Sequence, residues 1–486
     1  MVRKGIDVKL NVKPGYLHLI HRSAYEGPCR SGSGRQLTPE FDREIGEQKF
    51  ADFKDTLQRE YSDEVKMLDP VYLTWTDQYI FTEEQMGKLT RDMTDVDLFL
   101  FDGVFHQFPA SEIATRYRKP VGIIGCCAST DGVAAIRAKG LTAYGYIDHP
   151  HAASQMKYLR VKKAMRRTNV LVVLKDDIVS KGVLSTITNL QQFTMDQGVR
   201  FTFINAEEML EEVRKSSEGR EAEAQAIADD LIDNAEACMM EKDALVKSVR
   251  FYLAVKSVLH RYECNAFTLP CFEICATKQL DEEQYTFCLA HALLKEEGIP
   301  SACEADINVL MAMNVMINLT RKAPHMGNTH PLAQEEKTDQ SIPSGLRLIP
   351  ELEGRENVVS TWHAVPTRKM KGIDGEMMPY TIQPFTHGGW GATLRYDYNR
   401  DKGETITLLR FHPNGRKMFA VRGTIIGGAG IDEIGCQTGV YWEVEDVGDF
   451  FKKELEFGHH YAWVYGDYMD DLRELGEVLN VEVVTA

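Results

Sequence analysis

The segment SACEADINVLMAMNVMINLTRKAPHMGNTHP (residues 301–331) is the most informative part of the chain. It places two acidic residues, Glu304 and Asp306, between a predicted strand end and a strongly apolar helix. In α/β proteins, ligand sites lie at the carboxyl ends of parallel strands. The segment therefore predicts a turn from strand to helix that is suited to a functional site.

The residues before this segment continue the alternation of strand and helix. NVLVVLKDD (169–177) predicts a buried strand, and VRFTFINAEEMLEEVRK (199–215) predicts a strand that leads into a helix. A long helical tract is expected from about 219 to 262, followed by a strand in NAFTLPCFEICA and an acidic helix from 281. We interpret 161–340 as an α/β domain.

The first 160 residues show the same alternation. Strands are expected in KPGYLHLI (13–20), DVDLFLFDG (95–103) and KPVGIIGC (119–126). Between the first two, 38–61 carries apolar residues at helical spacing behind a Thr cap and a Pro in the first turn. The pattern predicts a parallel sheet covered on both faces, as an N-terminal α/β domain over 1–160.

The composition changes near residue 340. Short strand candidates separated by Gly and Pro follow, namely MPYTIQPFT, ATLRYDY, TITLLRFH, KMFAVRGTIIGG and TGVYWEVE. They predict a β-rich domain over 341–486, a small antiparallel barrel or sandwich that ends in a helix (468–479) and a strand. The predicted fold is thus α/β, with two Rossmann-like doubly wound parallel-sheet domains followed by a smaller, barrel-like C-terminal domain.

Composition excludes several classes of protein. The 486 residues are 43 % hydrophobic and 26 % charged, as in ordinary globular chains. With 72 acidic and 56 basic residues the formal charge is −16, and Lys and Arg are scattered, so we expect no nucleic-acid partner. We find no signal peptide and no apolar stretch of membrane-spanning length. Ten cysteines are too few for a disulfide scaffold, so we expect a cytoplasmic protein without membrane contact.

Two interpretations of the 301–331 segment remain open. One acidic residue can simply cap the apolar helix, and Asp306 is the better placed for that, which leaves Glu304 to be explained. The run HMGNTH (325–330) offers His325, Asn328 and His330, whose donor atoms suit a hard or borderline divalent cation. The alternative is that this run is only a loop.

Further candidates lie outside that segment. His363 follows a short apolar strand, His387 lies in the glycine-rich FTHGGWG, and His459 and His460 are adjacent. For each one alone, a structural histidine is the competing interpretation. Near the N-terminus, Arg30 lies in a Gly/Ser loop that could hold an anion or sugar hydroxyls, although the loop matches no nucleotide-binding motif.

Taken together, the motifs LPCFEICA, GIPSACEADINVLMAMNVMINLT, HMGN, VVSTWHAVP and GHHYAWVYGDY resemble the L-fucose isomerase and L-arabinose isomerase superfamily. The resemblance covers most of the chain. It implies a metal-dependent aldose–ketose isomerase of monosaccharides that uses Mn²⁺. It also implies a homo-oligomer, since relatives form trimers, tetramers and hexamers.

The resemblance also suggests roles for individual residues. Glu304 matches the first acidic metal ligand, and Asn328 stands where the L-fucose isomerase pattern has the second. His363 resembles a histidine near the metal, and one of His459 and His460, preferably His460, matches the C-terminal metal ligand. The residues expected to contact the sugar are Arg30, Glu273, His387 and Trp390.

Asn328 is the departure with chemical consequences. The family interconverts aldose and ketose through a cis-enediol, with two acidic groups moving a proton between C1 and C2. An amide can ligate a metal through its oxygen but cannot accept that proton. Asp306, Glu273 and His330 are the possible substitutes. Epimerisation at the same site, or sugar binding without turnover, are the alternative functions.

Overall fold

The computed structural model describes residues 3–27, 30–76, 82–125, 127–275, 278–332 and 346–486. The chain forms two compact units: an N-terminal unit, Val8–Arg160, and a C-terminal unit made of Val161–Ala486 together with Met1–Asp7. The expected division of the later residues into 161–340 and 341–486 stays a prediction. The candidate metal ligands all lie in the C-terminal unit.

The N-terminal unit contains a six-stranded parallel sheet. Its order is β2-β1-β4-β5-β6, with β3 also paired to β1 beside β2. The strands are β1 (Leu10–Ile20), β2 (Val65–Met67), β3 (Val71–Thr76), β4 (Leu98–Gly103), β5 (Val121–Ile124) and β6 (Ala143–Tyr146). The three strands predicted here are confirmed, except that residue 126 lies outside the described residues.

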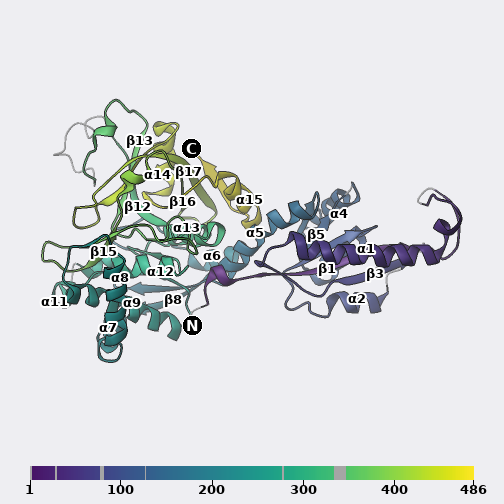
Figure 1. Cartoon of the computed structure of the whole chain (residues 1–486), viewed down its shortest axis with the longest axis horizontal. Coiled ribbons are helices and arrows are strands. Elements are labelled where there is room, and N and C mark those ends of the chain that lie inside the picture. The colour runs from purple at the N-terminus through teal and green to yellow at the C-terminus, as the bar shows by residue number, and fades with distance from the viewer. Residues whose placement is uncertain (1–2, 28–29, 77–81, 126, 276–277, 333–345) are drawn as a thin grey trace. The chain divides into compact units, whose positions relative to one another are not determined.

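Helices connect these strands. They are α1 (Pro39–Glu60), α2 (Glu83–Thr90), α3 (Gln107–Tyr117), α4 (Cys127–Arg137) and α5 (His149–Arg166). The predicted start of α1 is confirmed, because the Thr38 side chain accepts a hydrogen bond from the Phe41 amide and Pro39 occupies the first helical position. Figure 1 shows β1 and β3 passing between α1 and α2.

The C-terminal unit contains a second parallel sheet with the order β11-β10-β7-β8. Its strands are β7 (Asn169–Leu174), β8 (Arg200–Asn205), β10 (Ala266–Thr268) and β11 (Ser301–Ala302). The helices around it are α6 (Leu190–Gln197), α7 (Ala206–Gly219), α8 (Glu221–Asp233), α9 (Lys242–Arg261), α10 (Cys271–Cys275), α11 (Gln279–Glu283), α12 (Cys288–Glu296) and α13 (Ile307–Thr320). This confirms the predicted α/β character of the region.

Two helix predictions in this region were wrong in detail. The tract expected over 219–262 is divided into α8 and α9, because the intervening β9 (Ala237–Cys238) leaves the helical path to pair with β14 (Thr381–Pro384). The acidic helix expected from 281 is the single turn α11, and the longer α12 follows only after Gln284 adopts a left-handed conformation, with φ +60°.

The β-rich part closes into a six-stranded antiparallel barrel. Around the barrel the order is β16-β19-β12-β13-β18-β17, and β17 pairs back with β16. The strands are β12 (His325–Pro331), β13 (Val358–His363), β16 (Thr405–Phe411), β17 (Lys417–Ala429), β18 (Thr438–Glu443) and β19 (His460–Tyr465). Closure leaves the barrel strands few unpaired edges, and β20 (Glu482–Thr485) adds to β17.

Two features of the barrel differ from the sequence-based expectation. The polar run HMGNTH is not a loop but most of β12, where it pairs with β13 and β19. The candidates MPYTIQPFT and ATLRYDY form β14 and β15 (Ala392–Arg395), which join β9 in a separate three-stranded sheet. The remaining helices, α14 (Val447–Phe457) and α15 (Met469–Leu479), follow strands of the barrel.

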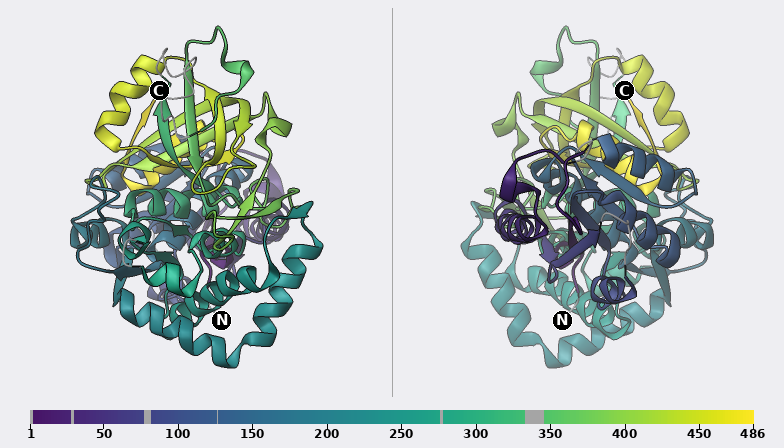
Figure 2. Two further views of the ribbon diagram at one scale, coloured as in Figure 1. Left: turned by 90° about the vertical axis from the view of Figure 1, so that its left-hand side faces the viewer. Right: turned by 90° about the vertical axis from the view of Figure 1, so that its right-hand side faces the viewer.

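Helix α13 links the parallel sheet to the barrel. It packs against β10 and β11 on one side and against β16 and β19 on the other, and Ile307–Asn318 are all buried. Figure 1 shows α12 and α13 between the barrel strands and helices α7–α9, and the views of Figure 2 show the same layers. Asn308 on α13 donates to the backbone oxygens of Ser185 and Phe411, at 2.7 and 2.9 Å.

No helix in the described ranges combines the length and the apolar character needed to cross a lipid bilayer. Helix α13 is apolar but has only 14 residues, and the 20-residue α9 carries several charged side chains.

Candidate metal centre

Glu304 lies in the short turn between β11 and α13. Glu304 and Ala305 both adopt left-handed backbone conformations, with φ of +61° and +51°. For residues with a Cβ atom such conformations are unfavourable by about 1–2 kcal/mol each, and they gather at functional sites. The turn is held by a hydrogen bond from the Ala305 amide to the Leu269 oxygen, 2.8 Å long. This turn fixes the direction of the Glu304 side chain.

Gly182 lies against the Glu304 carboxylate. A Cβ atom at position 182 would lie 2.7 Å from Glu304 Oε2, which is closer than a side chain allows. The segment after β7 therefore contacts the carboxylate through bare backbone.

Asp306 has a structural role at the start of α13. Its Oδ1 accepts a hydrogen bond from the Val309 amide, so it is the helix cap that the sequence predicted. Its Oδ2 accepts from Arg410 Nη1 at 2.7 Å and from His460 Nδ1 at 3.0 Å. Asp306 and Arg410 are both fully buried. Burial raises the pKa of Asp306, but Arg410 and His460 outweigh burial and hold it well below its usual range.

His460 and Asn328 are direct neighbours across the barrel wall. The register of β12 and β19 pairs Asn328 with His460, and His460 Nε2 lies 2.8 Å from Asn328 Oδ1. When Nδ1 donates its proton to Asp306, the neutral ring has a lone pair at Nε2, which then faces the lone pairs of the amide oxygen. A cation bound by both atoms as neighbouring ligands would satisfy both of them, as would an amide turned by 180°.

His363 lies at the end of β13 and points toward Glu304. Its Nε2 is 3.4 Å from Glu304 Oε1, and its ring centre is 5.9 Å from that of His460. Within the described residues, neither ring nitrogen of His363 has a hydrogen-bond partner, although the side chain is only 1 % exposed. Burial lowers the pKa of His363, so the ring is neutral at pH 7. A buried neutral imidazole without a hydrogen-bond partner has a ring nitrogen lone pair that it can offer to a metal ion.

Glu304, His363 and His460 form the candidate metal centre. One potential ligand atom from each lies within 4.8 Å of the others. Burial raises the pKa of Glu304, but the adjacent His363 and His460 lower it to about 2, so the carboxylate is ionised. Metal binding needs an ionised carboxylate and neutral imidazoles. Two imidazoles, a carboxylate and the Asn328 amide oxygen suit a borderline divalent cation, and they fit the Mn²⁺ implied by the family resemblance.

His459 lies outside this group of three. Its ring is next to that of His460, with centroids 4.2 Å apart, and its backbone oxygen accepts a hydrogen bond from the Thr329 amide at 2.7 Å. Burial, together with the neighbouring His460 and Arg410, lowers the pKa of His459 to about 4. Of the adjacent histidines, the geometry groups His460 with Glu304.

Glu273, one of the predicted sugar contacts, lies near the centre on α10. Its carboxylate accepts hydrogen bonds from Ser180 Oγ, at 3.1 Å, and from the Lys181 amide. These residues directly precede Gly182, which abuts Glu304. Glu273 thus supports the 180–182 segment, which contacts the Glu304 carboxylate.

The other predicted sugar contacts lie elsewhere. His387 is exposed in the turn after β14, and Trp390 packs partly buried against the core around the parallel sheet. Arg30 belongs to the N-terminal unit, where its Nη1 donates to Asp42 Oδ2 at 2.8 Å and its guanidinium lies over the Tyr25 ring. In the described residues, neither His387 nor Trp390 forms a hydrogen bond or an ion pair with Glu304, His363 or His460, and the sugar contact of Arg30 stays a prediction.

Arg410 is a residue of the candidate site that the sequence analysis did not single out. It is fully buried on β16 and donates hydrogen bonds to Asp306, to the His460 backbone oxygen at 2.8 Å and to Ser185 Oγ at 2.9 Å. The signal was available, because Arg410 is a lone charge inside the apolar strand TITLLRFH. Such a residue is rarely buried unless it is paired.

The chain has a distant similarity to known proteins. No family model matches the chain. The chain is 22 % identical over 346 residues to the sulfoquinovose isomerases of Priestia aryabhattai and of Priestia megaterium (strain ATCC 12872 / QMB1551). In both cases the match covers 68 % of this chain and 68 % of the relative. The chain is thus similar, over two thirds of its length, to proteins named as sugar isomerases.

Proposed function

We propose that this protein is a divalent-cation-dependent aldose–ketose isomerase, which acts on a monosaccharide or a sugar derivative through a cis-enediol. The observation that carries the proposal is the convergence of Glu304, His363 and His460, whose ligand atoms lie within 4.8 Å of one another. Similarity to two sulfoquinovose isomerases supports the same reaction class independently.

Glu304, His363 and His460, with the Asn328 amide oxygen, would hold the cation, and Mn²⁺ is the ion we expect. When bound, the cation would polarise the oxygens at C1 and C2 of the sugar and stabilise negative charge that develops on them. Asp306 and Arg410 do not face the sugar in this proposal. They keep His460 in the tautomer whose Nε2 lone pair points toward Glu304 and Asn328.

Glu304 is the proposed base for the proton that moves between C1 and C2. Its pKa of about 2 keeps it ionised at neutral pH, and its side chain is 16 % exposed, so a sugar can reach it. A cis-enediol allows the proton to leave C2 and return to C1 on the same face, so one carboxylate can perform both transfers. A second carboxylate at position 328 is then not needed for the transfer between the carbons, and the proton that moves from O2 to O1 passes through water.

The possible substitutes for a second acid at position 328 differ in their burial and in their partners. Asp306 is fully buried, and both of its oxygens already accept hydrogen bonds from protein groups. His330 is an exposed residue near the end of β12. Glu273 holds the 180–182 segment, in which Gly182 lies against Glu304, so in this proposal it contributes through that segment rather than by direct proton transfer.

The proposal is tested by incubating the purified protein with a panel of C5 and C6 aldoses in D₂O, with and without EDTA. The panel includes sulfoquinovose, which the relatives' name gives as their substrate. We expect ketose formation with deuterium incorporated from solvent, lost with EDTA and restored by Mn²⁺. Deuterium exchange at C2 without ketose would favour epimerisation at the same site. Sugar binding that survives EDTA, without exchange or product, would contradict catalysis altogether.

A further inference from the structure

The C-terminal unit has a second polar site at the opposite edge of its parallel sheet. Strands β7, β8, β10 and β11 are parallel, so Glu304, after β11, lies at their carboxyl edge. At the amino edge is a pocket of about 480 Å³, formed by residues that directly precede or begin β7, β8 and β10 and by the N-terminal segment. Strands of six residues span about 20 Å, so the pocket is separate from the candidate metal centre.

Arginines dominate this pocket. Arg3, Arg166, Arg167 and Arg200 line it, with Glu263 as the single acidic residue among its lining residues. All four arginines are exposed to solvent, and in the part of the chain that the structure describes none of their guanidinium groups pairs with a carboxylate. This arrangement is unusual in a chain with a formal charge of −16, in which many exposed arginines do pair with an acidic residue.

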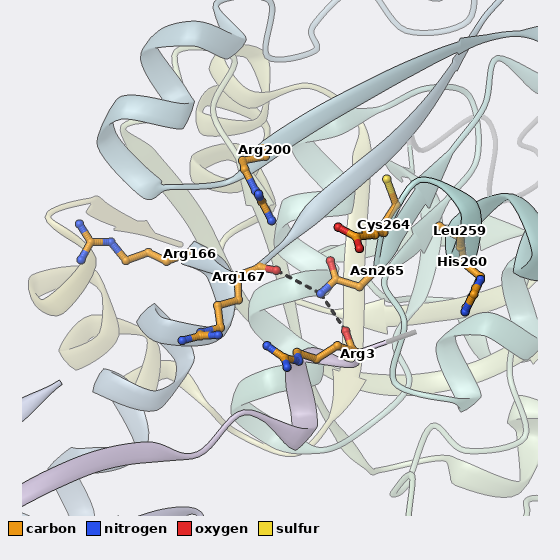
Figure 3. Close-up of a pocket in the computed structure, with 9 residues that line it drawn as sticks. Arg3, Arg166, Arg167, Arg200, Leu259, His260, Cys264 and Asn265 are labelled. Carbon is orange, nitrogen blue, oxygen red and sulfur yellow. Dashed lines mark hydrogen bonds between the residues drawn. The ribbon is translucent and has the colours of Figure 1, made fainter. Parts of the chain in front are cut away.

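A buried side-chain amide, that of Asn265, fixes the backbone at two of the four arginines. Asn265, only 8 % exposed, donates from Nδ2 to the backbone oxygens of Arg3 and Arg167, at 2.9 and 3.2 Å. Its Oδ1 accepts a hydrogen bond from the Asn169 amide at 2.8 Å. Figure 3 shows these two bonds from Asn265, with the Arg200 side chain directed toward it. Three separate segments are therefore held at one point.

The charge of the pocket indicates the charge of its ligand. Helices α5 and α9 end at Arg166 and Arg261, and each helix C-terminus contributes about half a negative charge. With Glu263, these ends offset about two of the four positive charges and leave a net charge of about +2. Guanidinium groups bind oxyanions through paired N–H donors, and phosphate suits that geometry.

We propose that this arginine pocket binds a small molecule through a tetrahedral oxyanion group, a phosphate or a sulfonate, independently of the metal centre. The net charge favours a dianion, and hence a phosphate over a singly charged sulfonate. The pocket volume of about 480 Å³ is in the range of small-ligand sites and leaves room for a ligand larger than the oxyanion itself.

The test is isothermal titration of the full chain with inorganic phosphate at pH 7.5, with methanesulfonate and chloride at matched ionic strength. We expect phosphate to bind one site per chain and chloride not to compete. Arg167→Gln/Arg200→Gln should weaken phosphate binding at least 10-fold, while Glu263→Gln, which removes the repelling carboxylate, should strengthen it about 2- to 3-fold. Arg422→Gln, an exposed arginine that pairs with Asp467, is the matched control and should leave binding unchanged.

Unchanged thermal melting of the double variant without ligand would show that its loss of binding is not a loss of fold. Tighter binding of methanesulfonate than of phosphate would support the pocket and identify the group as a sulfonate. Phosphate binding no stronger than that of chloride, or equal in the wild type and the double variant, would overturn the proposal.

Discussion

The charged groups at the two edges of the parallel sheet β11-β10-β7-β8 differ in burial and in pairing. At the carboxyl edge, the charged groups are buried and held by partners, as Asp306 is by Arg410 and His460. At the amino edge, Arg3, Arg167 and Arg200 are exposed, and the described residues offer them no carboxylate partner. Buried charges in this unit therefore hold side chains in fixed positions, whereas exposed unpaired charges are available to an outside ligand.

The largest effect is expected from Glu304→Gln at the carboxyl edge. The change keeps the shape of the side chain but removes the proposed base and one anionic ligand, so turnover should fall at least about 1,000-fold. Ketose formation at saturating Mn²⁺ measures this. Arg167→Gln/Arg200→Gln is the control from the other edge and should keep kcat/KM within about 2-fold of the wild type. Full activity in Glu304→Gln would remove this residue from the chemistry.

Arg410→Met tests whether the buried partners at the carboxyl edge are needed. It leaves the fully buried Asp306 without its cation, so the free energy of unfolding should fall by about 3–5 kcal/mol. Urea unfolding followed by circular dichroism measures the change. Arg410→Met/Asp306→Leu, which removes both charges, should regain much of the loss. An equal loss in the single and double variants would mean that packing, not charge pairing, is what Arg410 contributes.

Glu454 is a buried carboxyl group of the same unit whose pKa is raised, whereas the pKa values of Glu304 and Asp306 are lowered. Its effect on the pH dependence of stability is therefore the opposite of theirs. This side chain is 7 % exposed on α14, and burial raises its pKa to about 8. Because the folded state favours the protonated carboxyl, the stability it contributes is complete below about pH 4.5 and is lost as the pH rises to about 8.

Glu454→Gln removes that ionisation. The variant should match the wild type near pH 4.5 and be more stable by about 2–4 kcal/mol at pH 8, measured by urea unfolding across this range. Equal pH profiles for the two proteins would contradict the raised pKa of Glu454.

A smaller effect is expected from Asn328→Asp, which should raise the affinity of the candidate metal centre for Mn²⁺. An aspartate here would add a negative charge beside His460 Nε2, so the affinity for Mn²⁺ should rise about 10-fold, equivalent to about 1.4 kcal/mol. Mn²⁺ titration of the apo variant against the wild type measures this. Unchanged affinity would place Asn328 outside the cation's ligands.

Much of the fold could be predicted from local sequence. The alternation of strands and helices predicted both parallel sheets, and regular turns predicted the β-rich part, because these signals lie within a few residues. The polar strand β12 was not predicted, because His325–Pro331 lacks the apolar alternation of a strand and owes its state to pairing with β13 and β19. The pairing of β9 with β14 also depends on contacts distant in sequence.

The residues of the candidate site could be predicted from the sequence, but the contacts between them could not. Glu304, Asn328, His363 and His460 were singled out from motifs, yet the bond between Arg410 and Asp306 joins residues 104 positions apart. The same holds for the amino edge, where arginines that look scattered along the sequence are gathered by the order of the strands. Local patterns carry no information about such pairs.

The metal centre itself is tested by calorimetric titration of the EDTA-treated protein with Mn²⁺, for the wild type and for His363→Gln. His363 has no hydrogen-bond partner among the described residues, so its replacement removes a ligand with little effect on the fold. The predicted result is one Mn²⁺ per chain in the wild type and at least 10-fold weaker binding in the variant. Absence of Mn²⁺ binding in the wild type, or equal affinity in both proteins, would contradict the assignment of Glu304, His363 and His460 as a metal centre.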